Sequence, residues 1–136
     1  MPQEAQDFIQ TQRTGVIAVK MLDGTPHAAT VHVAYRSDPA CFIFLTSPKY
    51  RKLEPLRAGE TPASFVIGTT EELNKTLQMD GIAKLEDTED LRNVYFAKFP
   101  EKLDKHPDNV FFTFMPTWWR FTDWTAPKGK MILTSD

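Results

Sequence analysis

The dipeptide Asp23-Gly24, set between two strand-like segments, constrains the fold more than any other feature of the sequence. Residues 16–22 and 26–35 both have the composition of extended segments. Asp and Gly adopt the positive φ angles that a tight hairpin turn requires. The sequence therefore predicts an antiparallel hairpin over residues 16–35.

The rest of the chain continues this pattern of strands with a few short helices. Gly81 interrupts a long alternating segment and predicts a bulge or bend, as at the corner of a barrel. Further strands are expected at residues 41–46, 63–67, 75–85, 110–115 and 117–124, and the last two are joined at Pro116. A short tail strand is expected at residues 130–133. Helices are expected at residues 4–13, 48–57 and 87–98. We expect a mainly β protein with covering helices, folded as a six-stranded antiparallel split β-barrel, because closure removes exposed sheet edges. Residues 1–136 are expected to form a single domain.

Charge and composition exclude several classes of protein. The formal net charge of −2 argues against general nucleic-acid binding, which depends on a basic surface. No apolar run reaches the roughly 20 residues that span a bilayer, so no membrane partner is expected. The polar, acidic first ten residues do not resemble a signal peptide, which favours a cytoplasmic protein.

Metal and thiol chemistry find little support in the sequence. The single cysteine, Cys41, lies in an apolar segment and is expected to be buried as a small hydrophobic residue. His27, His32 and His106 show no ligand spacing with each other or with Cys41, so no metal site is predicted.

Four residues that suit a phosphate group lie close together between an expected strand and an expected helix. Thr46 and Ser47 offer hydroxyl donors, and Arg51 and Lys52 offer positive charge. Backbone amides at the start of the helix could point at the same anion. The same residues would also suit a capped surface helix with solvated basic side chains, and their spacing alone leaves both interpretations open.

The pair Trp118-Trp119 lies in a strand, where neighbouring side chains point to opposite faces. One ring should therefore enter the core. The other should mark an interface or the wall of a ligand site, or pack against a covering helix.

Three segments together resemble one known family. Residues 24–56 carry a hairpin whose second strand begins near Pro26-His27, and then a strand ending in Phe-Leu-Thr before the pair Arg51-Lys52. Residues 75–81 (KTLQMDG) and the aromatic ending at residues 118–124 (WWRFTDW) add to the similarity. The sequence is similar to the pyridoxamine 5′-phosphate oxidase-like split-barrel family, and in particular to its small, general-stress-protein-like members.

The resemblance implies an FMN-binding protein that pairs into a homodimer, with the flavin at the interface and a small-molecule substrate. The strand residues would follow the isoalloxazine ring through backbone groups, the four residues at the strand end would hold the phosphate, and the Trp-Arg pair would close the pocket from the same or from the other subunit. In that order, the implied cofactor-binding residues are Thr30, Val31, His32, Val33, Thr46, Ser47, Arg51, Lys52, Trp119 and Arg120.

The chain also departs from the oxidase itself at several positions. The oxidase has an Arg where Thr30 stands, a Lys at Tyr35, a Gln at Thr76 and often a Ser at Tyr50. We therefore expect an FMN-dependent oxidoreductase of unknown substrate, with unknown catalytic residues. The alternative is a non-catalytic split-barrel protein that binds flavin weakly, or haem through His32 or His106, or a deazaflavin.

Overall fold

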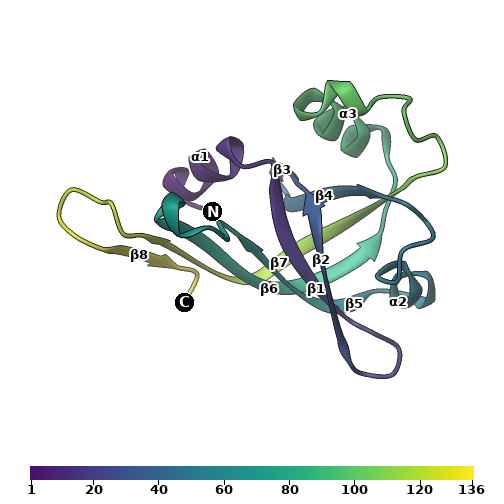
Figure 1. Ribbon diagram of the computed structural model, residues 1–136, viewed down its shortest axis with the longest axis horizontal. Helices are drawn as coiled ribbons and strands as arrows, with labels where there is room; N and C mark the ends of the chain where they lie inside the picture. Colours follow the sequence, from purple (N-terminus) through teal and green to yellow (C-terminus); the bar gives the residue numbers. More distant parts are fainter.

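One antiparallel sheet forms the centre of the computed structural model, which describes residues 1–136 (Figure 1). Its strands lie in the order β2-β1-β5-β6-β7-β4-β3, and β8 pairs with the far end of β7. The strands are β1 (Thr14–Lys20), β2 (Pro26–His32), β3 (Ala34–Ser37), β4 (Ala40–Thr46), β5 (Thr61–Ile67), β6 (Lys75–Leu85), β7 (Val110–Asp123) and β8 (Met131–Thr134). The helices are α1 (Gln3–Thr11), α2 (Leu53–Ala58) and α3 (Glu89–Lys98), with the short 3-10 turns η1 (Glu71–Leu73) and η2 (Pro100–Lys102). This is the mainly β architecture with covering helices that the sequence predicts.

The hairpin at Asp23-Gly24 is confirmed, but its second strand is divided. Strands β1 and β2 pair from Thr14↔His32 to Lys20↔Pro26, and Gly24 has a φ of 88° in the turn. The predicted strand 26–35 breaks at Val33, whose N–H bonds to Arg13 O at 2.9 Å. The chain there leaves β1 and goes on to pair with β4, so that β2 and β3 lie at the two ends of the sheet order. This division and the pairing of β8 explain why eight strands replace the expected six.

Strand β7 runs without a break through Pro116, so the prediction of two strands meeting there was wrong. Its register against β6 shifts between Asp80↔Trp118 and Gly81↔Pro116, which leaves Thr117 as the extra residue of a bulge. Proline fits at such a point because it has no N–H to offer the ladder. A Cβ atom on Gly81 would lie 2.1 Å from Met115 O, so the close approach of the two strands requires glycine. The predicted irregularity at Gly81 is confirmed, with the additional residue in the partner strand.

Aromatic side chains fill the interior. Phe42, Phe44, Phe65 and Phe114 belong to a main cluster of 22 buried residues, and their ring centroids lie between 5.2 and 6.2 Å apart in the contacts that link them. Helix α1 packs its buried face of Ala5, Phe8 and Ile9 against this cluster.

A second, smaller cluster of seven buried residues lies under α3. It joins Tyr95 and Phe99 to Cys41 and Ile43 on the other face of β4. Both faces of β4 are therefore covered, as its apolar sequence predicts. The thiol of Cys41 is buried, and burial raises its pKa.

The predicted helix 48–57 begins later than expected. Residues 48–52 form turns, with Tyr50 N bonded to Ser47 O and Leu53 N bonded to Tyr50 O, and α2 starts only at Leu53. Ser47 does not cap α2, because its Oγ instead accepts a hydrogen bond from Lys49 N at 3.3 Å. The predicted start of the helix at residue 48 is therefore wrong, and its first amides follow Lys52 instead of Ser47. None of the helices is long and apolar enough to cross a membrane.

Candidate functional site

The four phosphate-type residues lie at the end of β4 and in the turn that follows, but their environments differ. Thr46 is buried at the end of the strand, Ser47 is half-buried, and Arg51 is exposed. Lys52 is only 3% exposed. Arg57 of α2 helps to hold this turn by donating a hydrogen bond to Pro48 O.

The ammonium of Lys52 has neither a carboxylate partner nor a hydrogen bond in the structure. Its Nζ lies 4.5 Å from the centroid of the Tyr50 ring, and burial lowers its pKa. Partial desolvation of a charge that has no counter-ion is unfavourable. A phosphate group beside Lys52 would offset that cost, so the residues present fit the phosphate end of a flavin nucleotide.

Arg51 is oriented differently from Lys52. Its positive charge helps to lower the pKa of Asp23, for which the hydrogen bond from Thr25 is the largest cause. Arg51 therefore lies close enough to the β1–β2 turn to act on Asp23.

Strand β2 offers the implied flavin-ring residues in two orientations. The side chains of Thr30 and His32 are exposed, whereas those of Val31 and Val33 are buried in the core. Because β2 is the last strand of the sheet order, one side of its backbone has no strand partner. Free backbone groups are therefore available along β2, although the amide of Val33 is already bonded to Arg13 O.

His32 has contacts that the sequence does not reveal. Its Nδ1 lies 3.0 Å from Lys102 Nζ, and its ring meets Phe99 edge-on at 5.7 Å. Partial burial lowers the pKa of His32, and the charges of Lys102 and Arg13 lower it further. Lys102 can only donate, so the neutral imidazole accepts at Nδ1 and carries its proton on Nε2.

Trp119 and Arg120 lie on opposite faces of β7. Trp119 pairs with the buried Met79 and packs against the main core cluster, while Trp118 points outward beside Asp80. The prediction that one Trp faces inward is therefore confirmed. The exposed Arg120 donates from Nη2 to Gln78 Oε1 at 2.9 Å.

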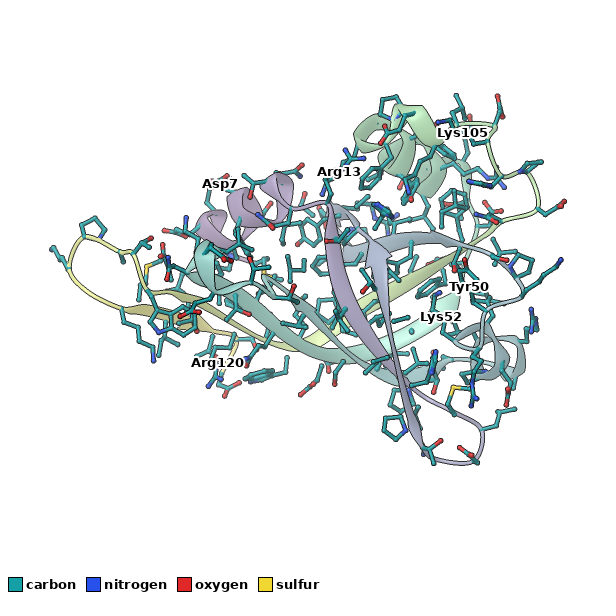
Figure 2. The ribbon with its side chains drawn as sticks, in the orientation of Figure 1. Asp7, Arg13, Tyr50, Lys52, Lys105 and Arg120 are labelled. Carbon is teal, nitrogen blue, oxygen red and sulfur yellow. The ribbon has the colours of Figure 1, made fainter.

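The structure does not bring Arg120 together with the phosphate-type residues of the same chain. Thr46 pairs with Val110 at the start of β7, and Arg120 lies ten positions further along that strand. At about 3.3 Å per residue, the separation is roughly 30 Å. Figure 2 accordingly shows Lys52 and Arg120 in different parts of the molecule. A pocket that contains both residues needs a second copy of the chain.

Sequence reasoning missed Gln78. It lies on β6, on the same face as Thr76, because residues two apart share a face of a strand. The hydroxyl of Thr76 is bonded to Ile67 O, whereas the amide of Gln78 is exposed next to Arg120. The period-two alternation of residues 75–80 could have identified Gln78 as the outward-facing amide.

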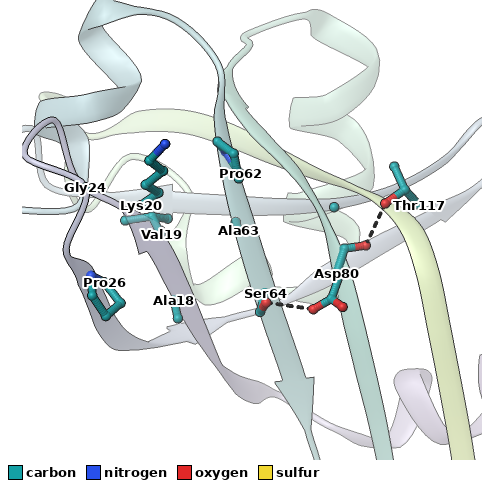
Figure 3. A pocket seen from close by; sticks show the side chains of 11 residues that line it. Ala18, Val19, Lys20, Gly24, Pro26, Pro62, Ala63, Ser64, Asp80 and Thr117 are labelled. Atoms are coloured by element: carbon teal, nitrogen blue, oxygen red, sulfur yellow. Dashed lines mark hydrogen bonds between the residues drawn. The ribbon is translucent and has the colours of Figure 1, made fainter.

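A groove of about 390 Å³ crosses β1, β5 and β6 on this outer sheet face (Figure 3). Ser64 donates to Asp80 Oδ1 at 2.7 Å, and Thr117 donates to Asp80 O at 3.2 Å. Lys20 lines the same groove. The side chains of Ser64, Gln78, Asp80 and Arg120 are exposed, so the outer sheet face is open on several adjoining strands.

The positions of the histidines and carboxylates do not form a metal centre. The structure contains no group of three or more His, Cys, Asp or Glu side chains that could hold a metal ion.

Comparison with known proteins yields one family and a common fold. The family model described as pyridoxamine 5′-phosphate oxidase matches residues 1–123. A search of curated proteins finds no significant match.

Three solved structures illustrate the shared fold. A putative general stress protein 26 from Jannaschia sp. CCS1 is 18% identical, with a TM-score of 0.74 over 96% of this chain and 94% of that one. A conserved hypothetical protein from Mycobacterium tuberculosis is 23% identical, with a TM-score of 0.69 over 90% of this chain and 85% of that one. The haem storage protein HutZ from Vibrio cholerae is 19% identical, with a TM-score of 0.63 over 83% of this chain and 87% of that one.

Proposed function

The chain belongs to the pyridoxamine 5′-phosphate oxidase family, and on that premise we propose that it binds FMN as a homodimer and acts as an oxidoreductase on a small molecule. The bound flavin would supply the hydride chemistry, while the protein positions it and tunes its surroundings. The substrate class is left open by this proposal.

The observation that carries the proposal is the side chain of Lys52, which is only 3% exposed and has no anionic partner of its own chain. The hydroxyls of Thr46 and Ser47 precede it in the same strand end and turn. Hydroxyl donors with a desolvated cation suit a phosphate group. The unpaired backbone edge of β2 at Thr30 and Val31 would offer donors and acceptors to the ring edge.

The separation of the implied pocket residues supports the proposed homodimer. Since Arg120 lies roughly 30 Å from Thr46 along β7 at about 3.3 Å per residue, the Trp119-Arg120 pair would come from the partner. The outer sheet face carries Arg120 and Gln78 and is open in the single chain. Light scattering is expected to give twice the chain mass of 15.6 kDa.

The first test is an FMN titration, followed by flavin fluorescence, of the wild type and of Lys52→Met. We expect the variant to bind FMN at least tenfold more weakly, about 1.4 kcal/mol, because it loses the charge that faces the phosphate. Its stability should be unchanged or higher, because a partly desolvated charge without a counter-ion has been removed.

The matched control is Lys49→Met, which removes an exposed lysine from the same turn. We expect this variant to bind FMN as the wild type does. A wild-type protein that quenches no flavin fluorescence would contradict the proposal, and equal affinities of the Lys52 and Lys49 variants would contradict the role of Lys52.

Haem is the second candidate ligand, favoured by the neutral imidazole of His32 with its Nε2 directed away from Lys102. A haem storage protein also shares the fold. A haemin titration of the wild type and of His32→Ala tests this candidate. Loss of the haem absorption shift in the variant would support it, whereas an unchanged shift would exclude His32 as the ligand. A deazaflavin, which needs a similar slot, can be titrated in parallel.

A further inference from the structure

The contact between Lys102 of η2 and His32 of β2 fixes an imidazole in one form on the free edge of the sheet. Lys102 Nζ donates to His32 Nδ1 at 3.0 Å, because an ammonium has only protons to offer. The neutral imidazole therefore carries its own proton on Nε2. This contact is the only side-chain hydrogen bond of His32, and its side chain is exposed. Strand β2 thus presents one N–H donor to its surroundings, with a positive charge directly behind it.

The residues around the Phe99 ring hold Lys102 in this position. Lys102 N bonds to Phe99 O at 3.0 Å, and Lys102 Nζ lies 5.6 Å from the centroid of the Phe99 ring. The His32 ring meets the same aromatic ring edge-on at 5.7 Å. The neighbouring carboxylate of Glu101 pairs with Arg13 and not with Lys102. The charge of Lys102 therefore has no carboxylate partner and can polarise the imidazole.

His32 and the residues proposed to hold the flavin phosphate lie towards opposite ends of β2. Arg51, the neighbour of Lys52, acts on Asp23 in the turn that precedes the strand. His32 is the last residue of β2, six positions after Pro26 and so roughly 20 Å away at about 3.3 Å per residue. A flavin that has its phosphate near Lys52 and follows the free edge of β2 would therefore bring its ring to His32.

We propose that His32 and Lys102 stabilise the reduced form of the flavin, with His32 Nε2 donating to the pyrimidine side of the ring. The hydrogen-bond acceptors of the ring lie on that side. Two-electron reduction with the uptake of one proton leaves a negative charge there, which a donor and a nearby positive charge favour. Lys102 is then a positioning residue that acts through His32. This inference rests on the proposed function and names the residues that tune its cofactor.

The first measurement follows the imidazole and needs no flavin. Two-bond proton–nitrogen NMR correlations of the nitrogen-15-labelled protein, in mildly alkaline buffer, should show His32 protonated on Nε2. Lys102→Met should gain the form protonated on Nδ1, because the ammonium no longer donates to that atom. The matched control is Lys105→Met, which removes an exposed lysine from the same loop and should keep the wild-type spectrum. An imidazole protonated on Nδ1 in the wild type, or identical spectra of the wild type and Lys102→Met, would overturn the proposal.

The second measurement is the ratio of the affinities for reduced and oxidised FMN. It combines the FMN titration with the two-electron midpoint potential of the bound flavin, measured during reduction by dithionite. Lys102→Met should lower this ratio at least fivefold, whereas Lys102→Arg, which retains a charged donor, and Lys105→Met should stay close to the wild type. In a His32→Phe background, the Lys102→Met substitution should change the ratio less than twofold, because Lys102 acts through His32.

The outcomes separate this inference from the proposed function. A wild type that binds FMN while Lys102→Met keeps its affinity ratio would overturn the inference and leave flavin binding intact. An equal effect of Lys102→Met with and without His32 would show that Lys102 acts directly on the flavin, against the proposal. A wild type that binds no FMN in either redox state would overturn the proposed function together with the inference.

Discussion

Lys52 is buried and Lys98 is half-buried, both without a carboxylate partner, and their surroundings differ in a way that separates a structural role from ligand binding. Lys98 donates to two carbonyl groups at the end of α1, so its positive charge stabilises the negative end of that helix. Lys52 has only the ring of Tyr50 beside it. We therefore expect the removal of Lys98 to affect stability and the removal of Lys52 to affect binding.

The lowered pKa of Lys98 predicts a specific dependence of stability on pH. In the unfolded chain the group titrates near 10.5, and in the folded protein near 8. Between these values the unfolded state holds more protons at this site, so its contribution to the free energy of unfolding rises with pH. Below pH 8 the contribution is constant and at its least favourable.

Urea unfolding of the wild type and of Lys98→Met between pH 7 and pH 10.5 measures this effect. The stability of the wild type minus that of the variant should increase from pH 8 upward. Burial also raises the pKa of Tyr35 and Tyr95, which has the opposite effect on stability but occurs in both proteins and cancels in the difference. A difference that does not change with pH would contradict the lowered pKa of the half-buried Lys98.

At the scale of elements, α3 covers the second core cluster and contacts η2. It has ten residues and would be marginal as an isolated helix, so it depends on its ends and on its packing. Thr88 caps its first turn, with Oγ1 accepting a hydrogen bond from Leu91 N at 3.2 Å. Leu91 and Tyr95 pack its inner face against the sheet.

Thr88→Ala should therefore lower the free energy of unfolding by about 1 kcal/mol, because one amide of the first turn loses its partner. Chemical denaturation measures the change. Thr88→Ser retains the hydroxyl and should stay close to the wild type. Equal losses in both variants would show that the methyl group of Thr88, and not its cap, stabilises α3.

At the scale of the whole molecule, the proposed flavin pocket needs residues that one chain holds far apart. Lys52 follows β4, whose end pairs with the start of β7, whereas Arg120 lies near the other end of β7. Each pocket would therefore combine Lys52 of one subunit with Arg120 of its partner. Such an arrangement predicts complementation between two defective chains.

Lys52→Met and Arg120→Ala should each weaken FMN binding when prepared alone. When the two variants are unfolded together and refolded in equal amounts, about a quarter of the sites should regain wild-type affinity, because half of the dimers are mixed and each holds one intact pocket. A flavin titration of the refolded mixture measures this fraction. A mixture that remains as weak as its components would show that each pocket is built within a single chain.

Short-range patterns predicted much of the fold. The hairpin at Asp23-Gly24, the apolar strand β4, the irregularity at Gly81 and the opposite orientations of Trp118 and Trp119 all follow from neighbouring residues. The break at Val33 and the late start of α2 did not follow. They depend on partners such as Arg13 O and on how the chain reaches the far end of the sheet.

The properties of the candidate site residues also divide into those that the sequence determines and those that depend on the tertiary structure. The sequence by itself determined that hydroxyls and cations gather between Thr46 and Lys52, because their spacing along the chain is short. Only the tertiary structure decided that Lys52 is buried and Arg51 exposed, that Lys102 meets His32 across 70 positions, and that Arg120 lies far from Thr46. The physical reason is that backbone geometry and alternation act between neighbours, whereas burial, charge pairing and distance depend on segments that meet only after the chain has folded.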